Sequence, residues 1–436
     1  MLIVLLLILL LFAGVFFYKC SRLHFMAPAF FVCAGFSLSV VCCILNMQNW
    51  YTQIDIVTIA VIVLSVCIFG AGDLCGESVS FPAVRFKQLY VFDFSCSQRI
   101  RVKKLNIMVT ELAFIFINIC YFRYTYQLSV IAGNRIGISG MISYARHASN
   151  YLNTGFDMPV IVSQGIVITK CAAYVFLFAF VYNLMNDRLR GRYFLLLLPC
   201  VSHSVNIILS TARIGFIEFF VYIFLITMVM LMKKKNVSLR INRTFMKMAA
   251  VSLAAFLIIF TVLGYATGKT QYLGAINAIL LYIGGSIIAF HQYLNKRPSR
   301  EFFGKETLRL FYAFLSKLGF DTPEYESYFL EFTNIGENAS TNVYTALRRY
   351  LQDYGFLGSA FVLFVLGFLY GHFFKLVIEG KKTGIALINT AAFAWPVFLF
   401  SIEEYSFKNL LGISSLYQIF YTFLLYYLFM KPEVKM

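Results

Sequence analysis

The sequence predicts an all-α, polytopic transmembrane helical bundle, and three observations support this fold class. The 436 residues are 60% hydrophobic, only 13% are charged, and the mean hydropathy is +0.76. A soluble domain carries roughly 25% charged residues. The apolar residues also gather in runs of about 20, the length needed to cross a bilayer as a helix. Helix packing inside a membrane therefore takes the place of a soluble core.

The apolar runs predict about eleven spans of bilayer length. They cover residues 1–17, 27–45, 54–70, 105–122, 160–184, 193–209, 214–232, 245–265, 356–378, 385–402 and 411–430. Segment 272–293 is apolar enough to be a twelfth span. If it crossed, Lys381, Lys382, Lys431 and Lys435 would face outward, which the positive-inside rule disfavours. We therefore expect 272–293 to be a re-entrant or surface-lying helix.

The charge pattern fixes the predicted orientation. The net charge is +17, and Lys and Arg concentrate on the cytoplasmic side of membrane proteins. Loops 73–104 and 187–192 and the run Lys233–Lys235 are basic and are predicted to be cytoplasmic, while 123–157 is predicted to be external. The first apolar run has its basic residues after it, so we expect a retained span that starts outside.

This topology divides the chain into three regions. Residues 1–265 form an N-terminal transmembrane region of about eight spans. Residues 266–354 form one long external loop with re-entrant and amphipathic helices, and 355–436 form a C-terminal transmembrane region of about three spans.

Cysteine and histidine spacing indicates neither a disulfide framework nor a metal site. The ten cysteines contain no CxxC pair, and the five histidines show no HxxxH spacing. We expect no metal and no cofactor. The sequence also offers no basic soluble face, so nucleic acid is not an expected partner.

Arg213, in LSTARIGF, lies between two predicted spans with almost no loop. The span that begins at Ile214 has free backbone N–H groups at the same place, and these together with a guanidinium suit a phosphate. The alternative is an arginine that extends to the lipid headgroups. Deeper in the same span, Glu218 is costly unless paired, and Lys170 is a conceivable partner.

The stretch 338–358, NASTNVYTALRRYLQDYGFLG, closes the long polar segment. Apolar residues at three- and four-residue steps from Val343 to Tyr354 predict an amphipathic helix, capped by Thr341 or Asn342. Arg349 and Asp353 have the spacing of a helical salt bridge. The candidate contacts to anions and sugars in this stretch are Arg348, Arg349, Asn342, Tyr344, Tyr350 and Asp353. A surface helix without such a role is the alternative.

Two stretches carry a family resemblance. STAR at Ser210–Arg213 and TNVYTALRRYLQDYGFLG at Thr341–Gly358, with YIGGSIIAF at Tyr282–Phe290, together resemble the oligosaccharide repeat-unit polymerases, the O-antigen polymerase family. The resemblance covers Ser210–Gly358 by motif and the rest by the layout of spans. It implies a GT-C-like, multi-pass glycosyltransferase of the bacterial inner membrane with a periplasmic active side.

The implied reaction belongs to surface polysaccharide (lipopolysaccharide) biosynthesis. A growing glycan leaves undecaprenyl pyrophosphate and joins a new lipid-linked repeat unit. The implied partners are these lipid-linked oligosaccharides, membrane lipid and a chain-length regulator protein. Preorganised arginines would stabilise the departing pyrophosphate without a metal.

The resemblance and the residue chemistry give one set of candidate site residues. We expect Arg213, Glu404 and Asp353 to be catalytic. The candidates for the general base are Glu337, Asp353, Glu403, Glu404 and His147, and Glu404 is favoured because the family carries acidic residues in its last external turn. The expected substrate-binding residues are Arg348, Arg349, Tyr344, Asn342, Arg135, Arg146, His147 and Glu337. Two other functions stay open: an O-antigen ligase, and a flippase or exporter of the lipid-linked oligosaccharide.

Overall fold

The computed structural model describes most of the chain. The described residues are 2–21, 25–79, 91–94, 98–152, 156–186, 191–210, 214–235, 275–296, 303–323, 330–337, 339–379 and 382–434, with isolated positions between 243 and 261. The protein is an all-α polytopic helical protein. Within the described residues, nine helices are long and apolar enough to cross a membrane.

The long helices follow the predicted apolar runs. They are α1 (Leu2–Cys20), α2 (Pro28–Leu45), α3 (Ile56–Ser78), α4 (Lys104–Ile131), α6 (Val160–Asn186), η2 (Gly191–Leu197) continued by α7 (Leu198–Leu209), α8 (Ile214–Lys235), α10 (Ala275–Lys296) and α12 (Ala346–Ile378). The shorter apolar helices are α13 (Ile385–Phe393) with α14 (Trp395–Phe398), and α16 (Ile413–Phe429). Only isolated positions of the predicted span 245–265 are among the described residues.

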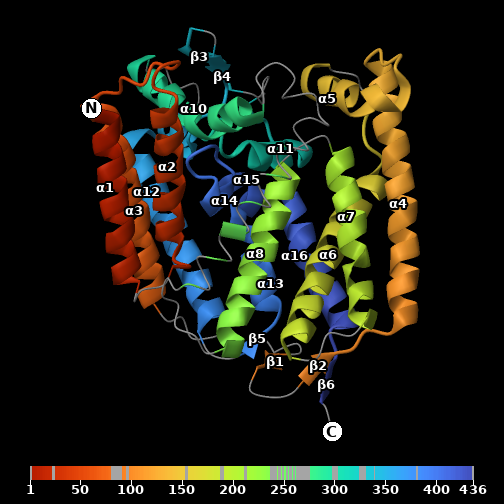
Figure 1. Cartoon of the computed structure of the whole chain (residues 1–436). Helices are drawn as coiled ribbons and strands as arrows, with labels where there is room; N and C mark the ends of the chain where they lie inside the picture. Colours follow the sequence, from red (N-terminus) through yellow and green to blue (C-terminus); the bar gives the residue numbers. More distant parts are fainter. Residues whose placement is uncertain are drawn as a thin grey trace.

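The connections gather at two ends of the bundle (Figure 1). One end, called here the α10 end, carries α10 and the short elements η1 (Gly137–Gly140), α5 (Met141–Tyr151), α11 (Arg309–Lys317), β3 (Thr333–Gly336), β4 (Ala339–Thr341) and α15 (Ser406–Leu411). The opposite end carries β1 (Phe92–Asp93) paired with β5 (Lys382–Thr383), and β2 (Gln98–Ile100) paired with β6 (Pro432–Val434). Segments predicted to share a side of the membrane therefore share an end.

Helix α10 lies across the ends of other helices although its length and hydropathy would allow a span. Cys43, near the end of α2, donates its thiol to the Gly284 carbonyl at 3.0 Å. The Oγ1 atom of Thr58, at the start of α3, lies 2.8 Å from His291 Nδ1. Tyr293 Oη donates to Gln352 Oε1 of α12 at 2.9 Å. Because these partners all lie at one end of the bundle, the arrangement agrees with the predicted surface-lying or re-entrant helix.

Helices α3 and α12 touch through their backbones. Each carries two glycines four residues apart, Gly72 and Gly76 in α3, and Gly367 and Gly371 in α12. A Cβ added at Gly72 would lie 2.1 Å from the Phe364 carbonyl oxygen. Small residues at this spacing allow two membrane helices to approach through their backbones.

Four predicted boundaries were wrong. Asp73 belongs to α3 and not to a loop, because its Oδ2 accepts the Ala29 amide of α2 at 2.8 Å, a favourable place for a carboxylate at a helix start. Helix α4 continues to Ile131, inside the predicted external loop. The predicted span 385–402 is broken, since Pro396, in the first turn of the separate helix α14, cannot donate a backbone hydrogen bond to the preceding turn. Helix α12 begins at Ala346, after the predicted caps.

The predicted pairing of Lys170 with Glu218 is confirmed. Lys170 Nζ lies 2.5 Å from Glu218 Oε1, joining α6 to α8, and Tyr174 Oη donates to the same oxygen at 3.1 Å. The two charged side chains are 20% and 13% exposed. They are largely removed from solvent, so each depends on the other for charge compensation.

Lys170→Met is expected to destabilise the protein by about 3–5 kcal/mol, because it leaves Glu218 charged and without its cation. The double variant Lys170→Met/Glu218→Gln keeps the bond from Tyr174 and removes both charges, so it is expected to recover most of this loss. Thermal unfolding in detergent measures both. If the double variant were no more stable than Lys170→Met, the loss of stability would not come from an unpaired Glu218.

Candidate functional site

A group of charged side chains meets at the α10 end, where α12 begins. We call it the charge cluster, and it consists of Arg348, Arg349, Glu306, Glu331 and Glu403. Its members come from four separate segments: the start of α12, the turn before α11, the residues before β3, and the turn after α14. Tertiary folding brings these segments together.

Arg348 makes two paired interactions with carboxylates. Its Nη1 donates to both oxygens of Glu306, and its Nη2 donates to Glu331 Oε1 at 3.1 Å and Oε2 at 2.8 Å. The guanidinium also lies over the rings of Tyr293 and Tyr344, at 5.1 and 5.2 Å from their centroids. This combination of pairing and aromatic stacking is specific to arginine.

Arg349 points in another direction from the helix, and it shares Glu306 with Arg348. Its Nε donates to Glu403 Oε1 at 2.8 Å, and its Nη1 donates to Glu306 Oε2 at 3.3 Å. Neighbouring residues in a helix point about 100° apart, so two adjacent arginines connect three glutamates. The amide of Ala346 donates to the Phe400 carbonyl at 3.0 Å and fixes the start of α12 beside the segment that carries Glu403.

The exposed fractions within the charge cluster differ. The side chains of Arg348 and Glu306 are 5% and 9% exposed, whereas that of Glu331 is 54% exposed. Buried charges are stable only when paired. Glu331 is therefore the carboxylate that a ligand would displace at the least cost.

Asp353, one turn after Arg349, binds the segment that carries Glu306 of the charge cluster. Its Oδ2 accepts the backbone amide of Thr307 at 2.8 Å and the hydroxyl of Thr307 at 2.7 Å, and its Oδ1 accepts the amide of Glu306 at 3.1 Å. These bonds hold Glu306 in place. The predicted salt bridge of Asp353 with Arg349 was wrong, because Arg349 reaches Glu306 and Glu403 instead.

Glu404 is buried next to the charge cluster. One of its carboxylate oxygens, Oε1, accepts the hydroxyl of Tyr350 at 2.9 Å and the amide of Phe407 at 2.9 Å. Burial raises the pKa of Glu404 to about 7, against lowering contributions from these two donors. A carboxyl group that titrates near neutral pH suits a general base.

The stability of the protein is expected to fall as pH rises from 4.5 to about 7, by about 3 kcal/mol from Glu404 alone. Within this window the folded state keeps a proton on Glu404 that the unfolded chain has lost. Glu404→Gln mimics the protonated form and is expected to remove this part of the slope of stability against pH. Melting temperatures in detergent at pH 5 and pH 8 measure it. Glu337→Gln, at an exposed position, is the control and should keep the wild-type slope; an unchanged slope in Glu404→Gln contradicts the assignment.

Other predicted site residues lie in different surroundings. Tyr344 and Tyr350 are buried at 2% and 0% exposure, and Tyr344 Oη donates to the Glu331 carbonyl at 3.2 Å. Asn342 is half-buried after β4, and Glu337 is exposed at the turn between β3 and β4. Tyr344 and Tyr350 thus belong to the support of the charge cluster, whereas Glu337 faces solvent.

The predicted residues of the first external loop lie beyond the end of α4, before η1 and on α5. Arg135 is exposed before η1, Arg146 is half-buried and His147 is exposed on α5. Helix α5 packs on the end of α4 through Ala145 and Ala148 (Figure 1). Arg213 lies outside the described residues. Its neighbours are described: α7 ends at Leu209, and α8 begins at Ile214.

The sequence prediction missed Glu306 and Glu331. Neither belongs to a motif, and their one signal is that the long external segment has nearly as many acidic as basic residues. The described residues contain no group of three or more His, Cys, Asp or Glu side chains able to hold a metal ion. Comparisons with protein-family models, curated proteins and solved structures gave no match to this chain.

Proposed function

We propose that this chain is an oligosaccharide repeat-unit polymerase, a glycosyltransferase of surface polysaccharide assembly. It transfers a growing glycan from undecaprenyl pyrophosphate to a lipid-linked repeat unit, at the periplasmic face of the bacterial inner membrane. The observation that carries the proposal is the charge cluster. It joins two arginines of the stretch Thr341–Gly358, which resembles this family, to a set of carboxylates at one end of an apolar bundle.

The charges of the cluster suit the proposed leaving group. A pyrophosphate gains negative charge as its bond to the sugar breaks, and preorganised arginines stabilise that charge. In the resting protein the two guanidinium groups are compensated by Glu306, Glu331 and Glu403. A substrate phosphate would replace the half-exposed Glu331 on Nη2 of Arg348. Arg213, from the turn before α8, would supply a further positive charge.

The reaction needs an acceptor for one proton. The acceptor hydroxyl of the lipid-linked unit attacks the anomeric carbon, the carbon–oxygen bond to pyrophosphate breaks, and undecaprenyl pyrophosphate leaves. Glu404 takes the hydroxyl proton in this proposal, because its pKa of about 7 lets it be ionised at the working pH of the cell envelope. Tyr350, bonded to Glu404, holds the carboxylate in place.

The test is the glycan profile of cells that lack the gene. A polymerase mutant is expected to display surface glycans with a single repeat unit, and the wild-type gene is expected to restore a ladder of longer chains. A mutant with no surface glycan would instead indicate the ligase or the flippase. Arg213→Ala is expected to reproduce the single-unit profile while the protein stays in the membrane.

The proposed orientation has its own test. An alkaline phosphatase domain, which is active only outside the cytoplasm, is fused after Phe320, an exposed residue that follows α11 at the α10 end. We expect an active fusion. A matched fusion after Val102, at the opposite end beside β2, is expected to be inactive. The reverse pattern would place the charge cluster in the cytoplasm and contradict the proposal.

A further inference from the structure

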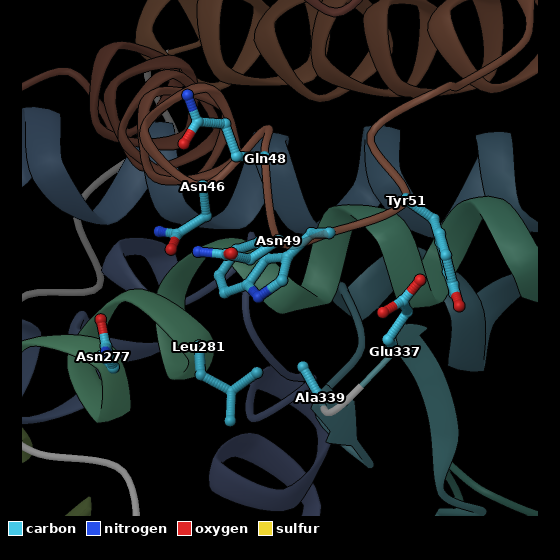
Figure 2. A pocket seen from close by; sticks show the side chains of 9 residues that line it. Asn46, Gln48, Asn49, Tyr51, Asn277, Leu281, Glu337 and Ala339 are labelled. Atoms are coloured by element: carbon cyan, nitrogen blue, oxygen red, sulfur yellow. The ribbon is translucent and has the colours of Figure 1, made fainter.

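A second feature of the α10 end is a cavity of about 420 Å³. Figure 2 shows its lining side chains, which come from the α2–α3 connection, from α10 and from the β3–β4 turn. The lining residues are Asn46, Gln48, Asn49, Trp50, Tyr51, Asn277, Leu281, Glu337 and Ala339. The volume falls within the roughly 300–1,000 Å³ typical of small-molecule sites.

Close backbone contacts fix the walls of this cavity. A Cβ added at Gly336 would lie 2.3 Å from the carbonyl oxygen of Asn49, and one added at Gly284 would lie 3.0 Å from the ring of Trp50. The amide of Tyr51 donates to the Ile335 carbonyl at 2.7 Å. The three segments are thus held against one another, and the cavity is formed before any ligand binds.

The lining chemistry suits an uncharged sugar. Four of the side chains are amides, each of which can both donate and accept hydrogen bonds as sugar hydroxyls do. Trp50 and Tyr51 provide aromatic surface of the kind that packs against apolar faces. Among the described residues that line the cavity, Glu337 is the one that is charged, and none is Lys or Arg. These residues offer a phosphate group no cation.

The cavity and the charge cluster share the same two elements. Leu281 lines the cavity, while Tyr293, twelve residues further along α10, lies under Arg348. Twelve helical residues span about 18 Å. The β3–β4 pair connects them as well, since Glu331 of the cluster precedes β3 and Glu337 of the cavity follows it. A glycan of several sugars could reach from one to the other.

We propose that this cavity binds neutral sugar residues of the glycan, at a distance from the pyrophosphate held by the charge cluster. The assignment rests on the proposed function for the identity of the glycan. The site thereby selects the repeat unit by its hydroxyl pattern, while the arginines bind the part common to all lipid-linked substrates.

The sequence provides a direct reporter, because the chain has two tryptophans, Trp50 and Trp395. Trp395 is buried in α14, and its Nε1 has no hydrogen-bond partner, so Trp395→Phe removes no bond. In this single-tryptophan protein, in detergent, we expect the repeat-unit oligosaccharide released from its lipid by mild acid to change Trp50 fluorescence saturably below about 10 mM. Inorganic pyrophosphate is expected to leave Trp50 fluorescence unchanged.

Matched variants locate the binding. Asn277→Leu, in the Trp395→Phe background, removes one amide from the lining and is expected to weaken binding about tenfold. Asn334→Leu changes an exposed asparagine of β3 outside the cavity and is expected to bind as before.

Several results would overturn the assignment. They are a fluorescence response to pyrophosphate, no response to the oligosaccharide in protein that elutes as a folded species, or equal weakening by Asn277→Leu and Asn334→Leu. The glycan profile of the gene-deleted cells separates this inference from the proposed function. A single-unit profile with no Trp50 response rejects the cavity alone, and a saturable response without a single-unit profile rejects the polymerase alone.

Discussion

Arg348→Gln is expected to reduce surface glycans to single repeat units, with a loss of polymerising rate of about 10²–10³-fold, the usual effect of removing one preorganised donor to a developing anion. Arg348 is the residue that joins the buried Glu306 to the half-exposed Glu331. Gel separation of the surface glycans measures the effect directly. A normal ladder from correctly folded Arg348→Gln would contradict a role in the reaction.

The same substitution also has a structural cost, because it leaves Glu306 and Glu331 without their shared cation. Breaking a buried pair costs about 3–5 kcal/mol. The double variant Arg348→Gln/Glu331→Gln lowers this cost and isolates the functional role. It is expected to melt closer to the wild type and still to give single units. If it restored the ladder, Arg348 would serve the fold alone.

Glu331→Gln by itself provides the control for charge. It keeps Arg348 paired with Glu306 and removes the exposed carboxylate that occupies Nη2 in the resting protein. The ladder is therefore expected to persist. Loss of the ladder in Glu331→Gln, with the protein folded, would mean that Glu331 takes part in the reaction and is not displaced by substrate.

Gly72→Ala is expected to prevent folding of the bundle. The new methyl group would lie 2.1 Å from the Phe364 carbonyl oxygen, a backbone atom of α12 that cannot rotate away. Relief requires α3 and α12 to separate, which also removes the contacts at Gly76, Gly367 and Gly371. Overpacking of this kind costs at least about 1–3 kcal/mol for each added group, and more where backbones touch.

Gly35→Ala is the matched control. Gly35 lies inside α2, and a Cβ there would be 3.5 Å from the Phe398 carbonyl oxygen, an ordinary contact. Alanine also favours a helix over glycine by about 1 kcal/mol. The yield of monodisperse protein in size-exclusion chromatography is expected to fall sharply for Gly72→Ala and to stay at the wild-type level for Gly35→Ala. Equal yields would show that α3 and α12 can separate without loss of the fold.

The first part of α12 illustrates how far the sequence predicted the site. Arg348 follows Tyr344 by four residues, which is one helical turn, and the guanidinium does lie over that ring. The Gly355 backbone has φ 65° and ψ −169° and interrupts α12 between the predicted amphipathic helix and the predicted span. Both features are local, and a helical pattern is enough to predict them.

The partners of the arginines could not be predicted in the same way. Glu306, Glu331 and Glu403 lie 42, 17 and 54 positions from the arginines they bind, and no local period relates them. The break at Pro396 is different, because a proline inside a predicted span is itself a signal of a helix break. The prediction of an unbroken span relied on hydropathy and did not use that signal.

The sequence by itself determined that this chain is a bundle of membrane helices, which connections share an end, and that Glu218 needs a charge partner inside the bundle. It did so because a bilayer forces apolar runs into helices and leaves few ways to bury a charge. Only the tertiary structure decided that Arg348 and Arg349 are held by three distant glutamates, and that an amide-lined cavity forms beside α10. These arrangements depend on side-chain directions and on glycine contacts between segments, which hydropathy does not encode.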